Sequence, residues 1–242
     1  MNFDFSEEQN LLREQARRFL DDNAEGKARK ILEGDEPFDY ELWQDMAELG
    51  WMGTVIPEEF GGTGLRHEDL CVLAEEIGRS LAPTPFSSSV YLATEAILLA
   101  GSEDQRADYL PRLAAGETVG CFAFGEGLKK PSADSISATF LNGKLSGTKY
   151  PVADGDVADF SVVLAWTPDS GPLLVLASLD GVGLEPMQTI DPSRSYAKLT
   201  FDDTPAEPLV GVGNGWGLTE RVLDRAAILI AFEQLGGAQK CL

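Results

Sequence analysis

The segment CFAFGEGLKKPSADS, residues 121–135, gathers glycine and lysine residues of the kind that can hold an anion. Gly125, Gly127, Lys129 and Lys130 lie within six positions of a chain that has 19 Lys and Arg against 40 Asp and Glu. A nucleotide-binding P-loop would end in Gly-Lys-Ser or Gly-Lys-Thr and lead into a helix, whereas here a proline and another β-rich run follow. Two interpretations of the lysine pair remain: a contact with an anionic ligand, or two solvated surface charges.

Composition argues against several other kinds of chemistry. The formal net charge is −21, which opposes extended contact with DNA or RNA phosphates, so no nucleic-acid partner is expected. His67 is the only histidine. We therefore predict no metal site and no histidine-dependent hydrolase site, and we interpret His67 as a surface loop residue.

Cysteine usage and hydropathy bear on the compartment. Cys71, Cys121 and Cys241 form no CxxC motif and are expected to be reduced and buried. The acidic N-terminus resembles no signal peptide, and no apolar run approaches the roughly 20 residues of a membrane span. The expected location is therefore cytoplasmic, with no membrane span.

The elements that must position the loop fall into three regions, and together they predict a multi-domain α+β fold. Residues 1–117 carry helical patterns, with a Ser6–Gln9 capping box at the start, and are predicted to form an all-helical domain. Residues 118–213 are predicted to form a small antiparallel β-barrel or sandwich, with a hairpin at Asn142-Gly143. Residues 214–242 are predicted to begin a helical bundle. The predicted helices lie near residues 6–22, 41–50, 67–80, 87–100 and 103–115, and the predicted strands are the runs GCFAF, ATFLNGKLSGTKY, FSVVLAW, PLLVLASL and YAKLTFDD.

The last helical stretch is unusually apolar. Residues 226–232 form an unbroken apolar run, so this helix should be buried on several sides. Its neighbours would come from another chain or from further residues of a longer protein. Glu220, Asp224 and Glu233 are interpreted as solvated or interhelical charges on this helix, and Arg194, in DPSRS, as a ligand or subunit contact or as a plain loop arginine.

In this order the motifs resemble those of the acyl-CoA dehydrogenase family. The turn VIPEEFGGTG, residues 55–64, matches that family's Pro-Glu-Glu-aromatic-Gly-Gly turn almost letter for letter. The resemblance covers essentially the whole chain. The other matching segments are FSEEQNLLREQARRF, LAEEIGRSLAPTPF, GSEDQRADYLPRLAAGE, GTKYPVADGDVADFSVVLA, DPSRSYAKLTFDDTPAE and LDRAAILIAFEQLGGAQKCL.

The resemblance implies a flavoprotein that removes two hydrogens from the α and β carbons of an acyl-CoA thioester. FAD would accept the hydride, and a protein carboxylate would take the α-proton. The resemblance further implies a homo- or hetero-oligomer built through a C-terminal helical bundle, with electron-transfer flavoprotein as the electron acceptor. The residues it assigns are the cofactor contacts Phe122, Phe124, Gly125, Val152 and Ala153 and the substrate contacts Lys129, Ser132 and Ala133.

Several positions depart from the family pattern. Gly125 stands where the family has a threonine, Pro151 where it has a flavin-covering tryptophan, and Ala153 where it has a threonine or serine. None of the three can supply the missing hydroxyl or indole. No catalytic base can be assigned, because most members carry it on a segment that corresponds to residues after 242, and the position used by a minority falls at Ala226.

The concentration of these departures on one surface favours a subunit whose own flavin site is degenerate. Such a chain would work beside a related subunit in a heterotetramer, as in dehydrogenases that act on steroid or bile-acid side chains. Two alternatives remain. One is a self-sufficient homo-oligomeric acyl-CoA dehydrogenase that holds FAD mainly through backbone amides, and the other is a non-catalytic binding or scaffold protein with this fold.

Overall fold

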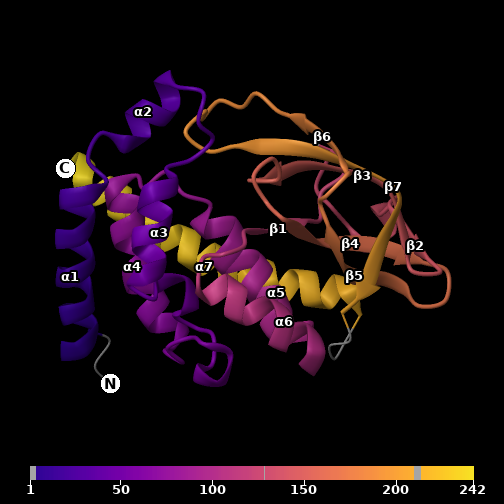
Figure 1. Cartoon of the computed structure of the whole chain (residues 1–242), viewed down its shortest axis with the longest axis horizontal. Helices are drawn as coiled ribbons and strands as arrows, with labels where there is room; N and C mark the ends of the chain where they lie inside the picture. The colour runs from indigo at the N-terminus through magenta and orange to yellow at the C-terminus, as the bar shows by residue number, and fades with distance from the viewer. Residues whose placement is uncertain (1–3, 128, 210–213) are drawn as a thin grey trace.

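The structure is a computed structural model and describes residues 4–127, 129–209 and 214–242. A group of N-terminal helices lies beside a small β-barrel, and the long helix α7 (Gly215–Cys241) runs along both (Figure 1). α7 contacts α4 and η3 in the helical part and β4 and β5 in the barrel. It therefore connects the two parts of the molecule, together with the contact between β1 and η3.

The N-terminal helices follow the predicted pattern closely. The capping box is confirmed, because the Ser6 hydroxyl accepts from the Gln9 amide at 3.2 Å and the Gln9 side chain accepts from the Ser6 amide at 2.9 Å. α2 was not predicted, because none of its residues is buried and it therefore shows no apolar stripe. The predicted helix at 87–100 begins as a π-helix, η3, and continues as α5. The helical elements are α1 (Glu7–Asn23), α2 (Lys27–Glu33), α3 (Tyr40–Glu48), η1 (Trp51–Gly53), η2 (Glu58–Phe60), α4 (His67–Ser80), η3 (Ser87–Thr94), α5 (Glu95–Ala100), α6 (Glu103–Ala114) and η4 (Ala133–Ser135).

The β-region is a sheet that closes on itself, in the order β1-β4-β2-β3-β7-β5 with a further β4–β5 pairing. The hairpin prediction is confirmed: Asn142 and Gly143 connect β2 to β3 with φ of 52° and 76°. Most pairings are antiparallel as predicted, but β1 and β2 both run parallel to β4. The strands are β1 (Gly120–Ala123), β2 (Thr139–Leu141), β3 (Lys144–Ala153), β4 (Phe160–Thr167), β5 (Gly171–Ser178), β6 (Gly183–Pro186) and β7 (Tyr196–Pro208).

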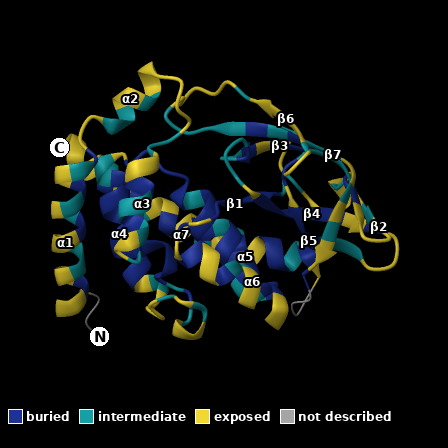
Figure 2. Cartoon of the chain, in the orientation of Figure 1, coloured by how far each residue is buried: buried dark blue, intermediate teal, exposed yellow. Residues whose placement is uncertain are grey.

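The sequence of strand β4 is apolar at nearly every position and does not alternate between apolar and polar residues. Phe160 and Leu164 face the cluster shared with the helices, whereas Val163 and Ala165 face the barrel interior. A strand that is covered on both faces needs apolar residues at every position. Figure 2 shows most of β4 as buried.

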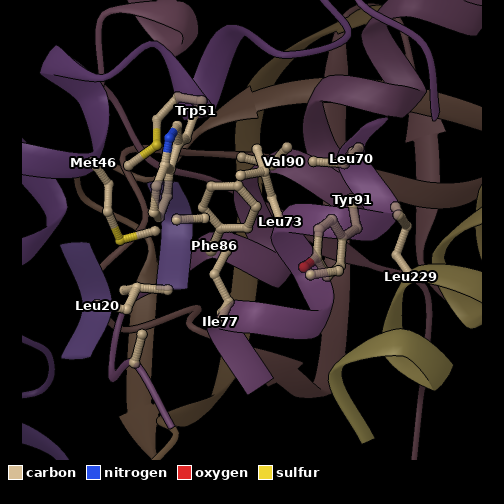
Figure 3. Packing of buried hydrophobic residues seen from close by; sticks show 14 of the residues in the cluster. Leu20, Met46, Trp51, Leu70, Leu73, Ile77, Phe86, Val90, Tyr91 and Leu229 are labelled. Carbon is tan, nitrogen blue, oxygen red and sulfur yellow. The ribbon is translucent and has the colours of Figure 1, made fainter. Parts of the chain in front are cut away.

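The helical core lies between α1, α4, η3 and α7. Phe86 and Tyr91 pack edge to face with their ring centroids 5.5 Å apart, and Leu229 of α7 joins the same cluster (Figure 3). Helices α4 and α7 approach closely at two glycines: a Cβ at Gly78 would overlap the α7 backbone, and a Cβ at Gly236 would overlap the α4 backbone. Glycine at these positions is therefore what allows the close approach.

Only one side of α7 is covered by the described residues. Ala226 and Leu229 are buried, but Ile228 and Ile230 are 56% and 40% exposed. This exposure is expected from the sequence if the remaining neighbours of the helix come from another chain or from further residues of a longer protein, because within the described residues α7 packs against α4, η3 and β5.

The remaining expectations concern the cysteines, a membrane span and a metal site. Cys71 and Cys121 are buried as predicted, but Cys241 is exposed because it lies in the last turn of α7. Within the three described ranges, no helix is long and apolar enough to cross a membrane. The same residues contain no group of three His, Cys, Asp or Glu side chains that could hold a metal ion.

Candidate functional site

The loop after β1 pairs with the end of β3. The Tyr150 amide donates to the Gly125 carbonyl at 3.0 Å, and the Gly127 amide donates to the Tyr150 carbonyl at 2.9 Å. These two bonds place the loop beside residues 151–153, although the two segments are separated in sequence. The two segments to which the resemblance assigns cofactor contacts therefore lie next to each other.

The Glu126 carboxylate holds this loop against β3 and the segment before β2. Its carboxylate accepts from the amides of Ser137 and Ala138, at 2.7 and 2.9 Å, and from the Lys149 ammonium at 2.7 Å. Lys149 is fully buried. Burial lowers the pKa of Lys149; burial alone would raise the pKa of Glu126, but Lys149 and the two amides hold it below its usual value. The pair is thus a charged, desolvated clamp between the loop and β3.

The residues assigned to the cofactor differ in how exposed their side chains are to a ligand. Phe122 and Val152 are core residues, 3% and 0% exposed, so only their backbone could meet a ligand. Phe124 is half-buried with its ring 5.7 Å from that of Phe122, and Gly125 is buried. Ala153 lines a cleft. The cofactor role of these residues remains a prediction.

The residues assigned to the substrate lie elsewhere. Lys129 and Ser132 are exposed and Ala133 is half-buried. Ser132 and Ser135 bond to each other around η4, and none of the three assigned residues lines the cleft beside Ala153. Within the described residues, the structure therefore does not bring the two assigned sets to one cavity.

The residues present do not fit a flavin ring held by side-chain hydrogen bonds. The Gly125 carbonyl and the Gly127 amide are already bonded to Tyr150, and the Glu126 carboxylate is occupied by Lys149 and two amides. Ala153 offers only a methyl group. These three polar groups of the loop are thus bonded within the chain rather than pointing toward a ligand.

A cleft of about 420 Å³ opens beside Ala153. It lies between η3, the turn after β3, the loop between β6 and β7, and α7, and its size is within the range of small-molecule sites. Its lining includes Leu92, Ala153, Asp154, Arg194, Ile230 and Glu233.

Arg194 and Glu233 form an ion pair across this cleft. Arg194 donates to the Glu233 carboxylate at 2.6 Å and to the Ser87 hydroxyl at 2.9 Å, so it connects the β6–β7 loop to both α7 and η3. Burial would lower the pKa of Arg194, but Glu233 and Asp154 raise it. Arg194 is therefore more than a plain loop residue. Glu233, with its side chain 9% exposed, is not solvated, and it interacts with Tyr91 of the neighbouring helix η3 as well as with Arg194.

Asp154 completes this charged group. Its carboxylate accepts from the Ser88 hydroxyl at 2.6 Å and from the Ser195 hydroxyl at 3.3 Å. Burial raises the pKa of Asp154 to about 6, although Ser88, Arg194 and Ser195 act in the opposite direction. Two carboxylates and one guanidinium thus meet where the helices, the barrel and α7 come together.

Replacing Asp154 by asparagine should stabilise the chain above pH 6. Because the folded pKa is raised, the folded chain keeps a proton that the unfolded chain has lost, so stability falls as pH rises from about 4 to about 6. The amide has no such penalty and still accepts from Ser88. We expect a gain of about 1–3 kcal/mol at pH 7.5 and little change at pH 4, measured by urea unfolding. Equal effects at both pH values would contradict the assignment.

A second buried carboxylate joins three helices. Glu95 of α5 accepts from Arg225 of α7 and lies 2.8 Å from the His67 ring nitrogen. His67 is the first residue of α4, so the prediction of a loop position is wrong. Burial would raise the pKa of Glu95, but His67 and Arg225 lower it overall.

The sequence does not predict the Arg194–Glu233–Asp154 group, because its members are far apart in the chain. The sequence feature that could have indicated this group is Glu233, a charged residue that directly follows the apolar run of residues 226–232. Ala226 is buried in the helical core and offers no carboxylate, so no base can be assigned at that position.

The fold and the loop geometry define a class: a helical layer, a small β-barrel and a long helix that bridges them. The family model of the acyl-CoA dehydrogenase N-terminal domain matches residues 6–117. An acyl-CoA dehydrogenase of Bacillus subtilis is 30% identical over 98% of this chain and 67% of its own length. The chain belongs to the acyl-CoA dehydrogenase family.

Another acyl-CoA dehydrogenase and a solved structure are similar to this chain over nearly all of its length. The acyl-CoA dehydrogenase IpdE2 of Mycobacterium tuberculosis is 32% identical over 98% of this chain and 62% of its own length. The solved structure of the Tcur3481-Tcur3483 steroid ACAD G363A variant superposes with a TM-score of 0.83 at 32% identity, over 97% of this chain and 64% of that chain. The chain thus spans roughly two thirds of the length of these relatives.

Proposed function

We propose that this chain is a subunit of an FAD-dependent acyl-CoA dehydrogenase that removes hydrogens from the α and β carbons of an acyl-CoA thioester. In this proposal its own flavin site is degenerate, and a related subunit carries the flavin. The complex would be a cytoplasmic heterotetramer that passes electrons to electron-transfer flavoprotein.

The observation that carries the proposal is that polar groups of the loop after β1 are already bonded within the chain. The Gly125 carbonyl, the Gly127 amide and the Glu126 carboxylate all bond to partners within the chain. At the end of β3, Pro151 and Ala153 bring neither an indole nor a hydroxyl. A ring bound here would meet a methyl group and a cleft that contains an ion pair, and desolvating that pair would be costly.

Two further observations support a partner of related structure. The relative of known structure at 32% identity is described as Tcur3481-Tcur3483, a name with two components. In addition, α7 exposes Ile228 and Leu235, which lie seven residues apart on one face of the helix. Exposed apolar residues on one helix face are consistent with a protein–protein contact.

Co-expression with a related acyl-CoA dehydrogenase chain from the same genome tests the proposal. We expect the two chains to purify together with bound FAD and to oxidise an acyl-CoA thioester with an artificial electron acceptor. The matched control is the same pair in which Ile228 is replaced by aspartate, which places a charge on the exposed stripe and should abolish co-purification. Full activity of this chain without any partner would contradict the proposal.

A further inference from the structure

Helix α7 carries a regular seam of exposed apolar residues. Its members recur at intervals of three, four and three residues, which places them along one face of the helix: Ile228, Ala231, Leu235 and Ala238. All four are exposed, with Ile228 at 56% and Leu235 at 47%. This spacing is typical of the a and d positions of paired helices, where each side chain inserts between residues of the facing helix. The face therefore has the form of a helix-pairing seam.

The positions that flank this seam are uncharged, although the chain carries a formal net charge of −21. They are Ala227, Phe232, Gln234 and Gln239. Like charges at such flanking positions make two helices repel each other, and opposite charges make them attract. A second copy of this acidic chain would be repelled over much of its surface, but it meets no like charge at these positions. The seam is therefore a place where two copies can approach.

The side chains of the seam alternate in size, because each of the large residues Ile228 and Leu235 is followed by an alanine. In a parallel pair of identical helices equal positions meet, so layers of two large side chains would alternate with layers of two alanines. In an antiparallel pair centred midway between Ala231 and Leu235, these two residues face each other. Ile228 then faces Ala238 of the second copy, so every layer holds one large and one small side chain. Such layers fill the space between two helices evenly.

We propose that, in the absence of a related subunit, two copies of this chain associate through this seam as an antiparallel pair of α7 helices. A contact in which the same patch serves on both subunits closes into a twofold dimer. The related subunit proposed above would use the same face and would compete with the second copy, but the pairing depends neither on flavin binding nor on dehydrogenase activity. Because the seam is short, the dimer should be weak, with a Kd of roughly micromolar or above.

Analytical ultracentrifugation of the purified full chain, without FAD or a partner, measures this association. We expect a reversible dimer at roughly 0.1 mM that dissociates on dilution. Ile228→Asp should give a monomer, whereas Leu184→Asp, the same change at a 41% exposed position on β6, should leave the dimer intact. An unmodified chain that stays monomeric at this concentration would overturn the proposal and assign the seam to a different helix. A dimer that Ile228→Asp does not weaken would overturn it as well.

An exchange of side chains within one layer tests the size complementarity. Ala238→Leu adds apolar area but places two large side chains in the layer with Ile228, so it should weaken the dimer by about tenfold or more. Adding Ile228→Ala restores one large and one small side chain, and the double variant should recover most of the affinity. If Ala238→Leu strengthens the association instead, the contact is non-specific and the proposed pairing is wrong.

Cross-linking tests the orientation of the two helices. In the antiparallel pair the two Gln234 residues lie close together beside the twofold axis, so a short bis-maleimide reagent should join two chains that carry Gln234→Cys. The exposed Cys241 lies eight residues beyond the axis in each copy, so the two copies of Cys241 are separated by sixteen residues of helix, about 24 Å, and should not be joined. Cross-linking of the unmodified chain through Cys241, without cross-linking at position 234 in the variant, would contradict the antiparallel arrangement.

Discussion

Replacing Gly236 by alanine is expected to destabilise the chain by about 2–4 kcal/mol, a loss of roughly 5–15 °C in melting temperature. A Cβ at Gly236 would overlap the Glu75 carbonyl of α4, and because this neighbour is backbone it cannot rotate away. Helices α4 and α7 must then separate, which also opens the contact at Gly78. Thermal unfolding monitored by circular dichroism measures the effect.

The adjacent residue provides a matched control. A Cβ at Gly237 would lie 3.5 Å from the Gly78 carbonyl oxygen, an ordinary contact. Because alanine is a better helix former than glycine, Gly237→Ala should stabilise the chain by about 0.5–1 kcal/mol. Opposite signs at neighbouring positions on one helix would be hard to obtain from any other packing of α7. A loss of stability at both positions would show that the α4–α7 contact is placed wrongly.

The second large effect is expected at Glu126. The substitution Glu126→Ala leaves the fully buried Lys149 ammonium without its partner, together with the amides of Ser137 and Ala138. Removing one member of a buried ion pair typically costs about 3–5 kcal/mol. We therefore expect a loss of this size in urea unfolding, together with faster hydrogen exchange at the Ser137 and Ala138 amides.

Two comparisons separate this mechanism from general damage to the loop. The double substitution Glu126→Gln with Lys149→Met removes both charges and should recover most of the lost stability. Glu185→Ala breaks an exposed ion pair with Lys198 and should cost less than about 0.5 kcal/mol. If Glu126→Ala is as mild as Glu185→Ala, Lys149 is not the buried cation that the structure shows.

The sequence alone predicts the helices and strands that have a strong local signal. The Ser6–Gln9 capping box and the Asn142-Gly143 turn are encoded within a few residues, so both predictions are confirmed. Helix α2 has no buried face and strand β6 is exposed throughout, so neither carries an apolar pattern that could be recognised. Local periodicity thus identifies elements that face the core and overlooks those on the surface.

The site is only partly predictable for a different reason. The resemblance identified the loop around Gly125 and the end of β3, and the hydrogen bonds through Tyr150 show that these segments are neighbours. It gave no indication that Arg194 and Glu233 pair, because they are 39 residues apart and meet only where α7 packs against the barrel and η3. A contact set by tertiary packing has no signature in either local segment.

The absorbance spectrum of the chain purified alone tests the central claim most directly. After incubation with excess FAD and removal of the free cofactor, the account predicts a colourless protein without the flavin bands near 370 and 450 nm. The same protocol applied to the chain co-purified with a related subunit should give a yellow complex. A yellow chain that retains a stoichiometric amount of FAD without any partner would contradict the proposal that its own flavin site is degenerate.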